Sequence, residues 1–307
     1  GEILKENNFS KNILLVADKN TLKASEGIEN SLEGFNVEYR LYDNIRVAEM
    51  FHVEEIEALI SGRDISVLSV GSGSVNDPCR LACARQNKLL CIFATAPSMD
   101  GYASASSSMT REGLKISLAS RAADVIIGDH DILAAAPLDL RLSGLGDMIA
   151  KYISIAEWQI SNLINGEYYC EKIAQMIKNA LHDCISHAKG LIEGDPASAG
   201  AVFDGLVLAG AAMAYAGCSR PASGVEHYFS HIWDMRGLEF GTPVSTHGFQ
   251  CCVGTVLAAK VYDMLRGYTP NREKATAELE KFDHSNDSFK TSRRQFYQAM
   301  GRFNASM

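Results

Sequence analysis

The chain lacks the features that would place it in a membrane or outside the cell. No apolar run approaches the roughly 20 residues that a helix needs to cross a bilayer. The best candidate, residues 206–216, is short and rich in alanine and glycine, which predicts a buried helix. No charged segment followed by an apolar one opens the sequence, as it would in a secretory signal. We therefore expect a cytoplasmic protein with no membrane span.

Cysteine pairing motifs are also absent, because no two cysteines have the CxxC spacing. In a chain without an export signal, we expect reduced thiols packed as small hydrophobic side chains. The adjacent Cys251 and Cys252 suggest a redox or metal role, but neighbours on a helix point to different faces, so we interpret both as core residues. The eight cysteines are Cys79, Cys83, Cys91, Cys170, Cys184, Cys218, Cys251 and Cys252.

Basic residues are in deficit, with 29 Lys and Arg against 37 Asp and Glu and a formal net charge of -8. A nucleic-acid interface needs clustered Lys and Arg, so we exclude that class of partner and expect a small-molecule substrate. The 307 residues are enough for two domains. A hydrophobic share of 47% is ordinary for a globular protein with a sizeable core.

The first part of the chain alternates apolar runs with helical patterns, which predicts a parallel sheet with helices on its faces. After residue 137, helical periodicity is nearly continuous. We therefore predict an α/β domain over residues 1–135 and an all-helical domain over 136–307. The predicted strands are 12–17, 37–41, 65–70 and 89–94, and the predicted helices are 21–32, 53–61, 78–86, 138–142, 146–165, 168–189, 196–216, 223–236, 249–266, 271–282 and 289–303.

A glycine-rich turn, GSGSVND from Gly71 to Asp77, follows the strand at 65–70. Glycine lets backbone N–H groups approach a phosphate, and a helix N-terminus favours negative charge. Asp18 ends an earlier strand, where a carboxylate can accept hydrogen bonds from a ribose. It can equally cap the following helix, and the sequence leaves both interpretations open.

A second polar loop, TAPSMDG from Thr95 to Gly101, follows the strand at 89–94. Thr95 and Ser98 would suit a cofactor and Asp100 a hydroxylated substrate, because ligands of open α/β sheets bind at the carboxyl ends of strands. A Pro-containing turn with local capping is the alternative. The serine-rich stretch 103–109 that follows indicates a mobile or ligand-adjacent segment rather than core.

Two histidines four residues apart, His227 and His231, are the strongest chemical signal, since such positions share one face of a helix. Asp147 upstream and His247 downstream complete the set. A carboxylate with imidazoles suits a catalytic divalent metal with an open coordination position, and zinc, nickel and iron all remain possible. Asp147 could instead be a helix N-cap after Gly146, and a plain hydrogen-bonded network stays open.

In order along the chain, five segments resemble the iron-containing alcohol dehydrogenase superfamily, most closely its bacterial sn-glycerol-1-phosphate dehydrogenases of the AraM type. They are VGSGSVND, TAPSMDGYAS, the stretch from DHDILAAAP to GLGDMIAKY, SRPASGVEHYFSH and THG, and the resemblance covers residues 12–262. It implies a dinucleotide-binding α/β domain followed by a helical domain, the dehydroquinate synthase-like fold. Tyr228, Gln250 and Cys252 depart from the usual family pattern.

The resemblance also implies roles for individual residues. Metal ligation falls to Asp147, His227 and His247. Substrate contacts fall to Asp100, Asp147 and His231, of which Asp147 and His231 would be catalytic. Independently, a guanidinium matches phosphate oxygens, which makes Arg220 a candidate for a substrate phosphate alongside a purely structural role. The implied NAD(P) contacts are Asp18, Gly73, Ser74, Val75, Asn76, Asp77, Thr95, Ala96, Pro97, Ser98 and Ser104.

The reaction implied is reversible reduction of dihydroxyacetone phosphate to sn-glycerol 1-phosphate with NAD(P)H and one divalent metal ion, by a homodimer. A glycerol or other polyol dehydrogenase on the same scaffold is one alternative. A dehydroquinate-synthase-like lyase is another, although it usually has a glutamate as its first metal ligand where this chain has Asp147. A non-catalytic nucleotide-binding protein is the third.

Overall fold

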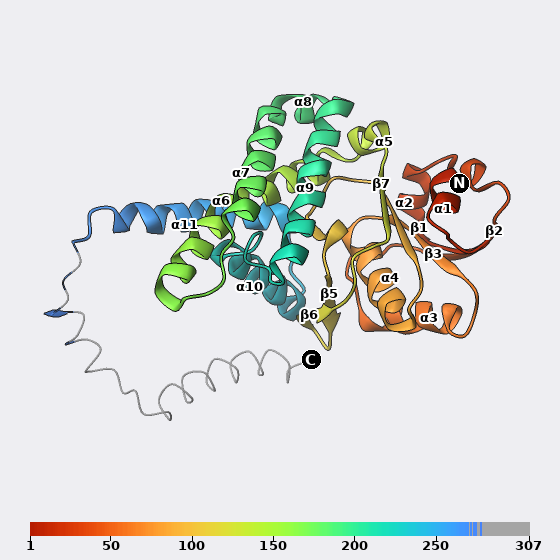
Figure 1. Cartoon of the computed structure of the whole chain (residues 1–307), viewed down its shortest axis with the longest axis horizontal. Coiled ribbons are helices and arrows are strands. Elements are labelled where there is room, and N and C mark those ends of the chain that lie inside the picture. Colours follow the sequence, from red (N-terminus) through yellow and green to blue (C-terminus); the bar gives the residue numbers. More distant parts are fainter. Residues whose placement is uncertain (270, 272, 275–276, 278–307) are drawn as a thin grey trace.

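The computed structural model describes residues 1–269, 271, 273, 274 and 277, with an α/β part and a helical part (Figure 1). Its elements in chain order are α1 (Glu2–Glu6), β1 (Asn12–Asp18), α2 (Lys19–Ala24), η1 (Ile28–Leu32), β2 (Asn36–Tyr42), α3 (Met50–Ile60), β3 (Ser66–Gly71), α4 (Gly73–Gln86), β4 (Leu90–Ala94), η2 (Gly101–Ala103), β5 (Ser106–Arg111), β6 (Leu114–Ala119), β7 (Val125–Gly128), α5 (His130–Ala135), α6 (Leu138–Asn165), α7 (Glu171–Ser186), α8 (Ala188–Glu193), α9 (Pro196–Ala216), α10 (Val225–Phe240) and α11 (His247–Leu265).

The central sheet has five parallel strands in the order β2-β1-β3-β4-β7. Side chains of β1 alternate between its two faces. Ile13 and Leu15 pack with residues of α1 and η1, whereas Leu14 and Val16 pack with residues of α3 and α4. Because helices cover both faces, the inner strands are almost wholly buried and mostly apolar. This confirms the predicted parallel sheet and the strands at 12–17, 37–41, 65–70 and 89–94 within one residue at each end.

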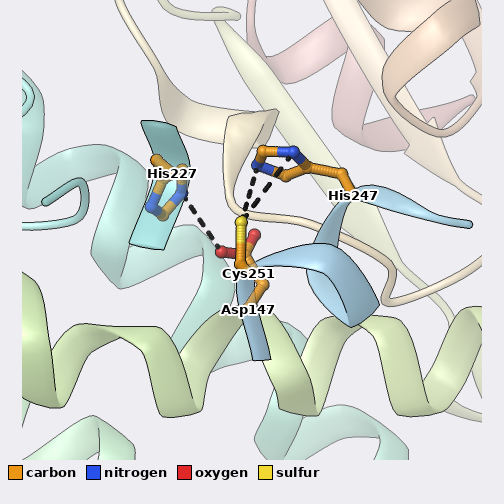
Figure 2. Close-up of side chains that lie close together, drawn as sticks. All are labelled: Asp147, His227, His247 and Cys251. Carbon is orange, nitrogen blue, oxygen red and sulfur yellow. Dashed lines mark hydrogen bonds and ion pairs between the residues drawn. The ribbon is translucent and has the colours of Figure 1, made fainter. Parts of the chain in front are cut away.

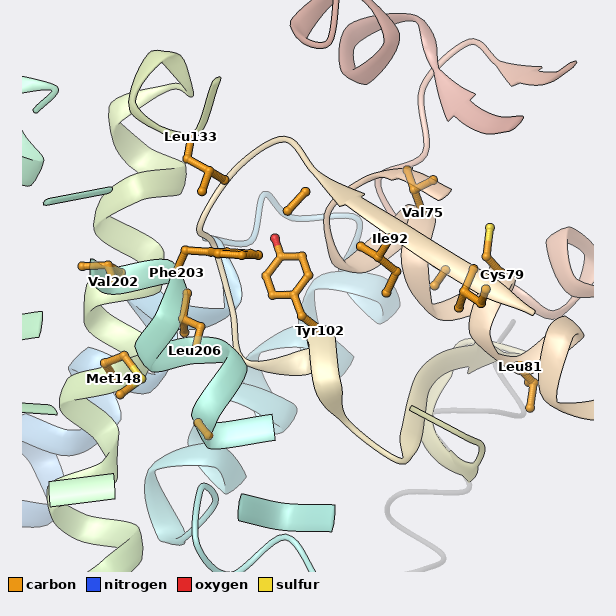
Figure 3. Close-up of a cluster of buried hydrophobic side chains, with 14 of the residues drawn as sticks. Val75, Cys79, Leu81, Ile92, Tyr102, Leu133, Met148, Val202, Phe203 and Leu206 are labelled. Carbon is orange, nitrogen blue, oxygen red and sulfur yellow. The ribbon is translucent and has the colours of Figure 1, made fainter. Parts of the chain in front are cut away.

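One hydrophobic core runs from the sheet into the helical part (Figure 3). Tyr102, which is fully buried, contacts Phe203 of α9, with ring centroids 5.0 Å apart at 66°. Ile92 of β4 and Leu206 of α9 belong to the same cluster. The boundary predicted at residue 135 falls between α5 and α6. It stays a prediction, because the core is continuous across it.

Helix α9 has both bounds of the predicted helix at 196–216. Asp195 caps it by accepting from the Ser198 N–H, and Pro196 opens it where no N–H is needed. Among the described residues, α9 is the one helix long and apolar enough to cross a membrane. However, 56% of the apolar 18-residue stretch of α9 that meets this criterion is buried inside the protein. We interpret α9 as a core helix, as predicted.

Several predicted helix limits are wrong. The helix predicted at 21–32 is divided into α2 and η1, with Gly27 in the left-handed region at φ 91°. The helix predicted to start at Pro78 starts at Gly73, so Pro78 lies inside it. The helices predicted at 138–142 and 146–165 are a single helix, α6.

The serine-rich stretch 103–109 is also corrected, since most of it forms β5, which pairs antiparallel with β6. Ser107 and Met109 are fully buried. The turn of this hairpin has positive φ at Glu112 and Gly113, as a two-residue hairpin turn requires. The segment predicted at 168–189 comprises α7 and α8, and α10 ends four residues later than predicted. Helix 289–303 and most of helix 271–282 lie outside the described residues.

Helices α6 and α11 cross with their backbones in direct contact. A Cβ added to Gly248 would lie 1.7 Å from the carbonyl oxygen of Ser143, and one added to Gly146 would lie 2.6 Å from that of Gly248. Neither obstacle is a side chain that can rotate away. Glycine at these positions therefore sets the distance between the two helices.

We predict that Gly248→Ala lowers the free energy of unfolding by about 3 kcal/mol or more, the upper end for overpacked interiors, because the helices must separate. Denaturant titration followed by circular dichroism measures this. Gly267→Ala is the control, since a Cβ there has nothing within 4 Å. Equal stability of the two variants would contradict the close crossing.

Candidate metal centre

Four side chains from three helices converge in the helical part (Figure 2). Asp147 comes from α6, His227 from α10, and His247 and Cys251 from α11. One ligand atom of each lies within 4.8 Å of all the others. The structure thus brings together the three residues predicted to bind metal and adds a thiol. Asp147 lies well inside α6, so the alternative of an N-cap at this position is wrong.

The imidazole of His227 is oriented by its chain neighbour Glu226. Glu226 is fully buried, and its Oε1 lies 2.8 Å from Nδ1 of His227 and accepts from the Gly224 N–H. Because a carboxylate only accepts, Nδ1 carries the proton and the Nε2 lone pair is free for a metal. Nε2 lies 3.7 Å from Oδ1 of Asp147. This pairing of carboxylate and histidine is the usual outer shell of a metal site.

His247 is oriented by a longer chain of hydrogen bonds. Its Nδ1 lies 3.0 Å from Oγ of Ser230, and that hydroxyl donates to Oε1 of Gln250 at 2.7 Å. Since the hydroxyl proton goes to Gln250, Nδ1 of His247 is the donor and Nε2 is again free. Gln250 in turn donates to Oδ1 of Asp234 at 2.8 Å, and Oδ2 of Asp234 pairs with Lys115 of β6. This series of hydrogen bonds therefore connects His247 to the β5–β6 hairpin.

A fully buried lysine, Lys151, lies between two carboxylates. Its Nζ is 2.8 Å from Oδ1 of Asp147, one helical turn earlier, and 2.5 Å from Oδ2 of Asp100. Burial lowers the pKa of Lys151, but the two carboxylates outweigh it and the pKa lies above its ordinary value. Lys151 is thus an ammonium ion that holds Asp100 beside Asp147.

The donor set fits a divalent cation. Two imidazole nitrogens and a carboxylate are a usual ligand set for zinc and other first-row metals. Three carboxyl groups, of Asp100, Asp147 and Glu226, surround the centre, and the ammonium of Lys151 bonds only the first two. Oε2 of Glu226 is buried with no hydrogen-bond partner among the described residues. A cation would offset this excess of negative charge.

His231 lies beside this group, with its ring centroid 6.5 Å from that of His247. Its Nδ1 is buried with no hydrogen-bond partner among the residues described. Burial, helped by the charge of Lys115, lowers the pKa of His231 to about 4. His231 is therefore neutral near pH 7 and free to bond a ligand.

Three predicted cofactor segments lie at the carboxyl ends of neighbouring strands. In the sheet order β2-β1-β3-β4-β7, β2 is added on one side of β1 and the later strands on the other, so the strand order reverses between β1 and β3, which is the usual position of a ligand. Asp18 ends β1, the glycine-rich turn follows β3, and Thr95 follows β4. Asp18 caps α2, since its carboxylate accepts from the N–H groups of Asn20, Thr21 and Ile45. The capping interpretation is confirmed, and the ribose contact stays a prediction.

The glycine-rich segment is the first turn of α4 rather than a loop. Ser72, its N-cap, makes no capping hydrogen bond through its side chain. Further along, Val75 packs in the core, Asn76 accepts from Ser69, and Asp77 pairs with buried Arg80. These three side chains already make contacts within the protein. Cofactor contacts predicted at Gly73, Ser74, Val75, Asn76 and Asp77 would therefore use mainly the main chain.

The loop over 95–101 is docked on α6. Ser143 donates to the carbonyl of Ser98 at 3.0 Å, and the Asp100 N–H donates to Oδ2 of Asp147 at 2.9 Å. A Cβ on Gly144 would lie 1.9 Å from the carbonyl oxygen of Pro97. The buried residues of this segment are Thr95, Ala96, Pro97, Ser98 and Asp100, and the predicted cofactor residue Ser104, after η2, is buried as well. The predicted cofactor loop and the predicted ligand Asp147 thus contact each other directly.

Arg220 is engaged elsewhere, because its Nε donates to Oε1 of Glu167 at 2.9 Å. This supports the structural alternative for Arg220. Five residues of the site were missed as site residues: Lys151, Glu226, Ser230, Gln250 and Cys251. The adjacency of Glu226 to His227 and the four-residue spacings from Asp147 to Lys151 and from His247 to Cys251 could have indicated three of them.

The comparisons with known proteins agree with this geometry. The profile of the iron-containing alcohol dehydrogenase family matches residues 1–137. A glycerol-1-phosphate dehydrogenase (NAD(P)+) of Bacillus subtilis is 31% identical over 286 residues, covering 89% of this chain and 72% of that protein. One of Thermococcus sibiricus is 32% identical over 266 residues, covering 86% and 74%. One of Halalkalibacterium halodurans is 34% identical over 195 residues, and the match spans 49% of its length.

Among solved structures, a probable glycerol dehydrogenase from Sinorhizobium meliloti superposes with a TM-score of 0.67 at 16% identity, covering 86% of this chain and 76% of that one. Glycerol dehydrogenase from Schizosaccharomyces pombe has a TM-score of 0.66 at 17% identity, covering 85% and 68%. At this identity the likeness establishes the fold alone.

We predict that Glu226→Gln lowers zinc affinity roughly 10–100-fold, as the loss of an outer-shell carboxylate typically does. Competition with a chromophoric chelator measures it. Glu193→Gln, on the exposed end of α8, should bind zinc as the wild type does. Unchanged affinity in Glu226→Gln would remove Glu226 from the outer shell.

The lowered pKa of His231 predicts a pH effect on the stability of the metal-free protein. Between the ordinary pKa of 6.5 and the folded value of about 4, the unfolded chain binds a proton at His231 that the folded protein does not. The free energy of unfolding therefore falls as the pH drops through this window, by at most about 1.4 kcal/mol per pH unit for one proton. His231→Gln should lose less stability than the wild type from pH 6.5 to 4. If the free energy of unfolding falls equally with pH in the wild type and in His231→Gln, His231 is not buried as a neutral ring.

Proposed function

The chain belongs to the iron-containing alcohol dehydrogenase family, and on that basis we propose that it is a metal-dependent, NAD(P)-linked oxidoreductase that interconverts dihydroxyacetone phosphate and sn-glycerol 1-phosphate. The observation that carries this proposal is the convergence of Asp147, His227 and His247, with both imidazoles presenting Nε2. The relatives named glycerol-1-phosphate dehydrogenase support the choice of substrate.

Asp147, His227 and His247 would hold the divalent metal. When bound, such an ion acts as a Lewis acid on an oxygen of the substrate. The protein prepares this centre through Glu226 and Ser230, which fix the two imidazole rings. Lys151 balances the charge of Asp147 while leaving it beside the histidines.

NAD(P) would bind across the carboxyl ends of β1, β3 and β4 and supply or accept the hydride. A phosphate fits the N-terminus of α4, where glycine lets it approach main-chain N–H groups. Contacts are proposed at Asp18, Gly73, Ser74, Val75, Asn76, Asp77, Thr95, Ala96, Pro97, Ser98 and Ser104. The docking of loop 95–101 on α6 supports a cofactor position next to the metal centre.

The substrate would contact Asp100, Asp147 and His231. Asp100 is fixed by Lys151, so its carboxylate has one defined position for binding a hydroxyl. His231 is neutral and its Nδ1 has no partner among the described residues, which suits it to orient substrate or to pass a proton.

The division into domains over 1–135 and 136–307, a homodimer and a cytoplasmic location are part of the proposal. The division is supported by the last strand of the sheet ending at Gly128 and by α6 starting at Leu138. The location is supported by the cysteines, all eight of which are free thiols, as is usual in a reducing compartment. The homodimer rests on the family resemblance alone.

The test is consumption of NADH and NADPH with dihydroxyacetone phosphate, before and after chelation and after metal is restored. We expect turnover that chelation abolishes and metal recovers, with a product that sn-glycerol-3-phosphate dehydrogenase does not oxidise. Asp147→Asn should abolish turnover, and Glu193→Gln should not change it. Faster turnover of dihydroxyacetone than of its phosphate would favour a polyol dehydrogenase, and turnover indifferent to chelation would contradict the proposal.

A further inference from the structure

Cys251 belongs to the same cluster of side chains as the three predicted metal ligands. It follows His247 by four residues on α11, so both side chains lie on one face of the helix. Its Sγ is 3.6 Å from Nε2 and 3.9 Å from Nδ1 of His247 (Figure 2). Cys251 is fully buried, and the other two members of the cluster are Asp147 and His227.

Two separations among these atoms are close to the edges of a metal tetrahedron. At the usual zinc distances, with tetrahedral angles, a sulfur and a nitrogen ligand lie roughly 3.6 Å apart, and a nitrogen and an oxygen ligand roughly 3.3–3.5 Å apart. The Sγ–Nε2 distance between Cys251 and His247 is 3.6 Å. The Nε2–Oδ1 distance between His227 and Asp147 is 3.7 Å. The sulfur–nitrogen pair therefore already has the length of a tetrahedral edge, and the nitrogen–oxygen pair is longer than one by only a few tenths of an ångström.

The donor atoms also have their lone pairs available. Nδ1 of each histidine is taken up by Glu226 or Ser230, so each Nε2 is left without a proton. The thiol of Cys251 has only long contacts with the His247 ring. Four atoms that can each donate a lone pair thus converge, and the S–H group is the weakest hydrogen-bond donor among the polar groups present.

We propose that Cys251 is the fourth protein ligand of the metal, which makes the centre a sulfur, two-nitrogen, one-oxygen site and selects zinc over harder cations. This inference rests on the metal centre of the proposed function and adds a ligand to it, so a substrate oxygen would enter as a fifth ligand, a coordination number that catalytic zinc can reach. On binding, the S–H bond breaks, the sulfur lone pair forms the bond to the metal, and the proton leaves to the buffer. No electron is transferred. Soft thiolate ligands favour zinc, whereas oxygen ligands suit magnesium and manganese.

Cobalt(II) replaces zinc as a coloured probe of this site. Full-length protein is stripped of metal, kept reduced under anaerobic conditions, and titrated with cobalt(II). We expect two signals from the wild type: visible ligand-field bands, which report a bound ion, and near-ultraviolet sulfur-to-cobalt charge transfer, which reports a thiolate ligand. Cys251→Val, which keeps the apolar volume, should retain the first signal and lose the second. Cys251→Ser should do the same.

Cys252→Ala is the matched control, because Cys252 adjoins Cys251 but lies outside the ligand group. It should keep both signals. Zinc affinity should fall in Cys251→Val by more than the roughly 10–100-fold typical of losing an outer-shell partner, and manganese affinity should fall less. At a fixed pH, the wild type should release one more proton per metal ion than Cys251→Val.

Two different results would overturn the inference, and they can be told apart. Ligand-field bands without charge transfer in the wild type, or charge transfer that persists in Cys251→Val, would show a metal centre without Cys251. The proposed function would then stand. No cobalt bands in any variant would mean that the metal centre itself is wrong, and the proposed function would fall with it.

Discussion

The close crossing of α6 and α11 is the constraint on which the rest of the site depends. Gly248 lies against the backbone of α6 at a distance that admits no Cβ. This crossing places Asp147, on α6, against the first turns of α11, which carry His247 and Cys251. Gly254, further along α11, allows a close contact with the backbone of α10 at Glu226, where an added Cβ would lie 2.6 Å from the carbonyl oxygen. One helix with two glycines therefore brings ligands from three helices to one point.

Hydrogen bonds then decide which atoms face that point. Glu226 and Ser230 each occupy the Nδ1 of one histidine, so the two rings present equivalent nitrogens although their partners differ in charge. Lys151 is the only ammonium within hydrogen-bonding distance of Asp147 in the described part of the chain. A buried ammonium between carboxylates is stable only if every partner is kept. The polar groups at the site therefore depend on one another, as in other buried networks.

Much of this could be predicted from sequence, and the misses have physical reasons. The inner strands are mostly apolar on both faces, so their positions could be predicted from the apolar runs in the sequence. The start of α9 is indicated by Asp195, which caps the helix, and by Pro196, which occupies its first turn. Gly144 and Gly146, by contrast, appear to interrupt a helix locally, whereas they are needed for contacts with Pro97 and Gly248, far away in sequence. Ser230 and Gln250 were missed because their partners lie on another helix and are known only once the helices are packed.

The α/β part supports the metal centre from two directions. Its loop 95–101 donates the Asp100 N–H to Asp147, and its β5–β6 hairpin reaches His247 through Lys115, Asp234, Gln250 and Ser230. A shift of the α/β part relative to the helices would disturb two predicted ligands together. The same loop carries predicted cofactor contacts, so a movement of this loop would shift the proposed positions of cofactor and metal together. Polar groups fixed in this way need no rearrangement when charge develops on a substrate, which is how a preorganised site lowers a reaction barrier.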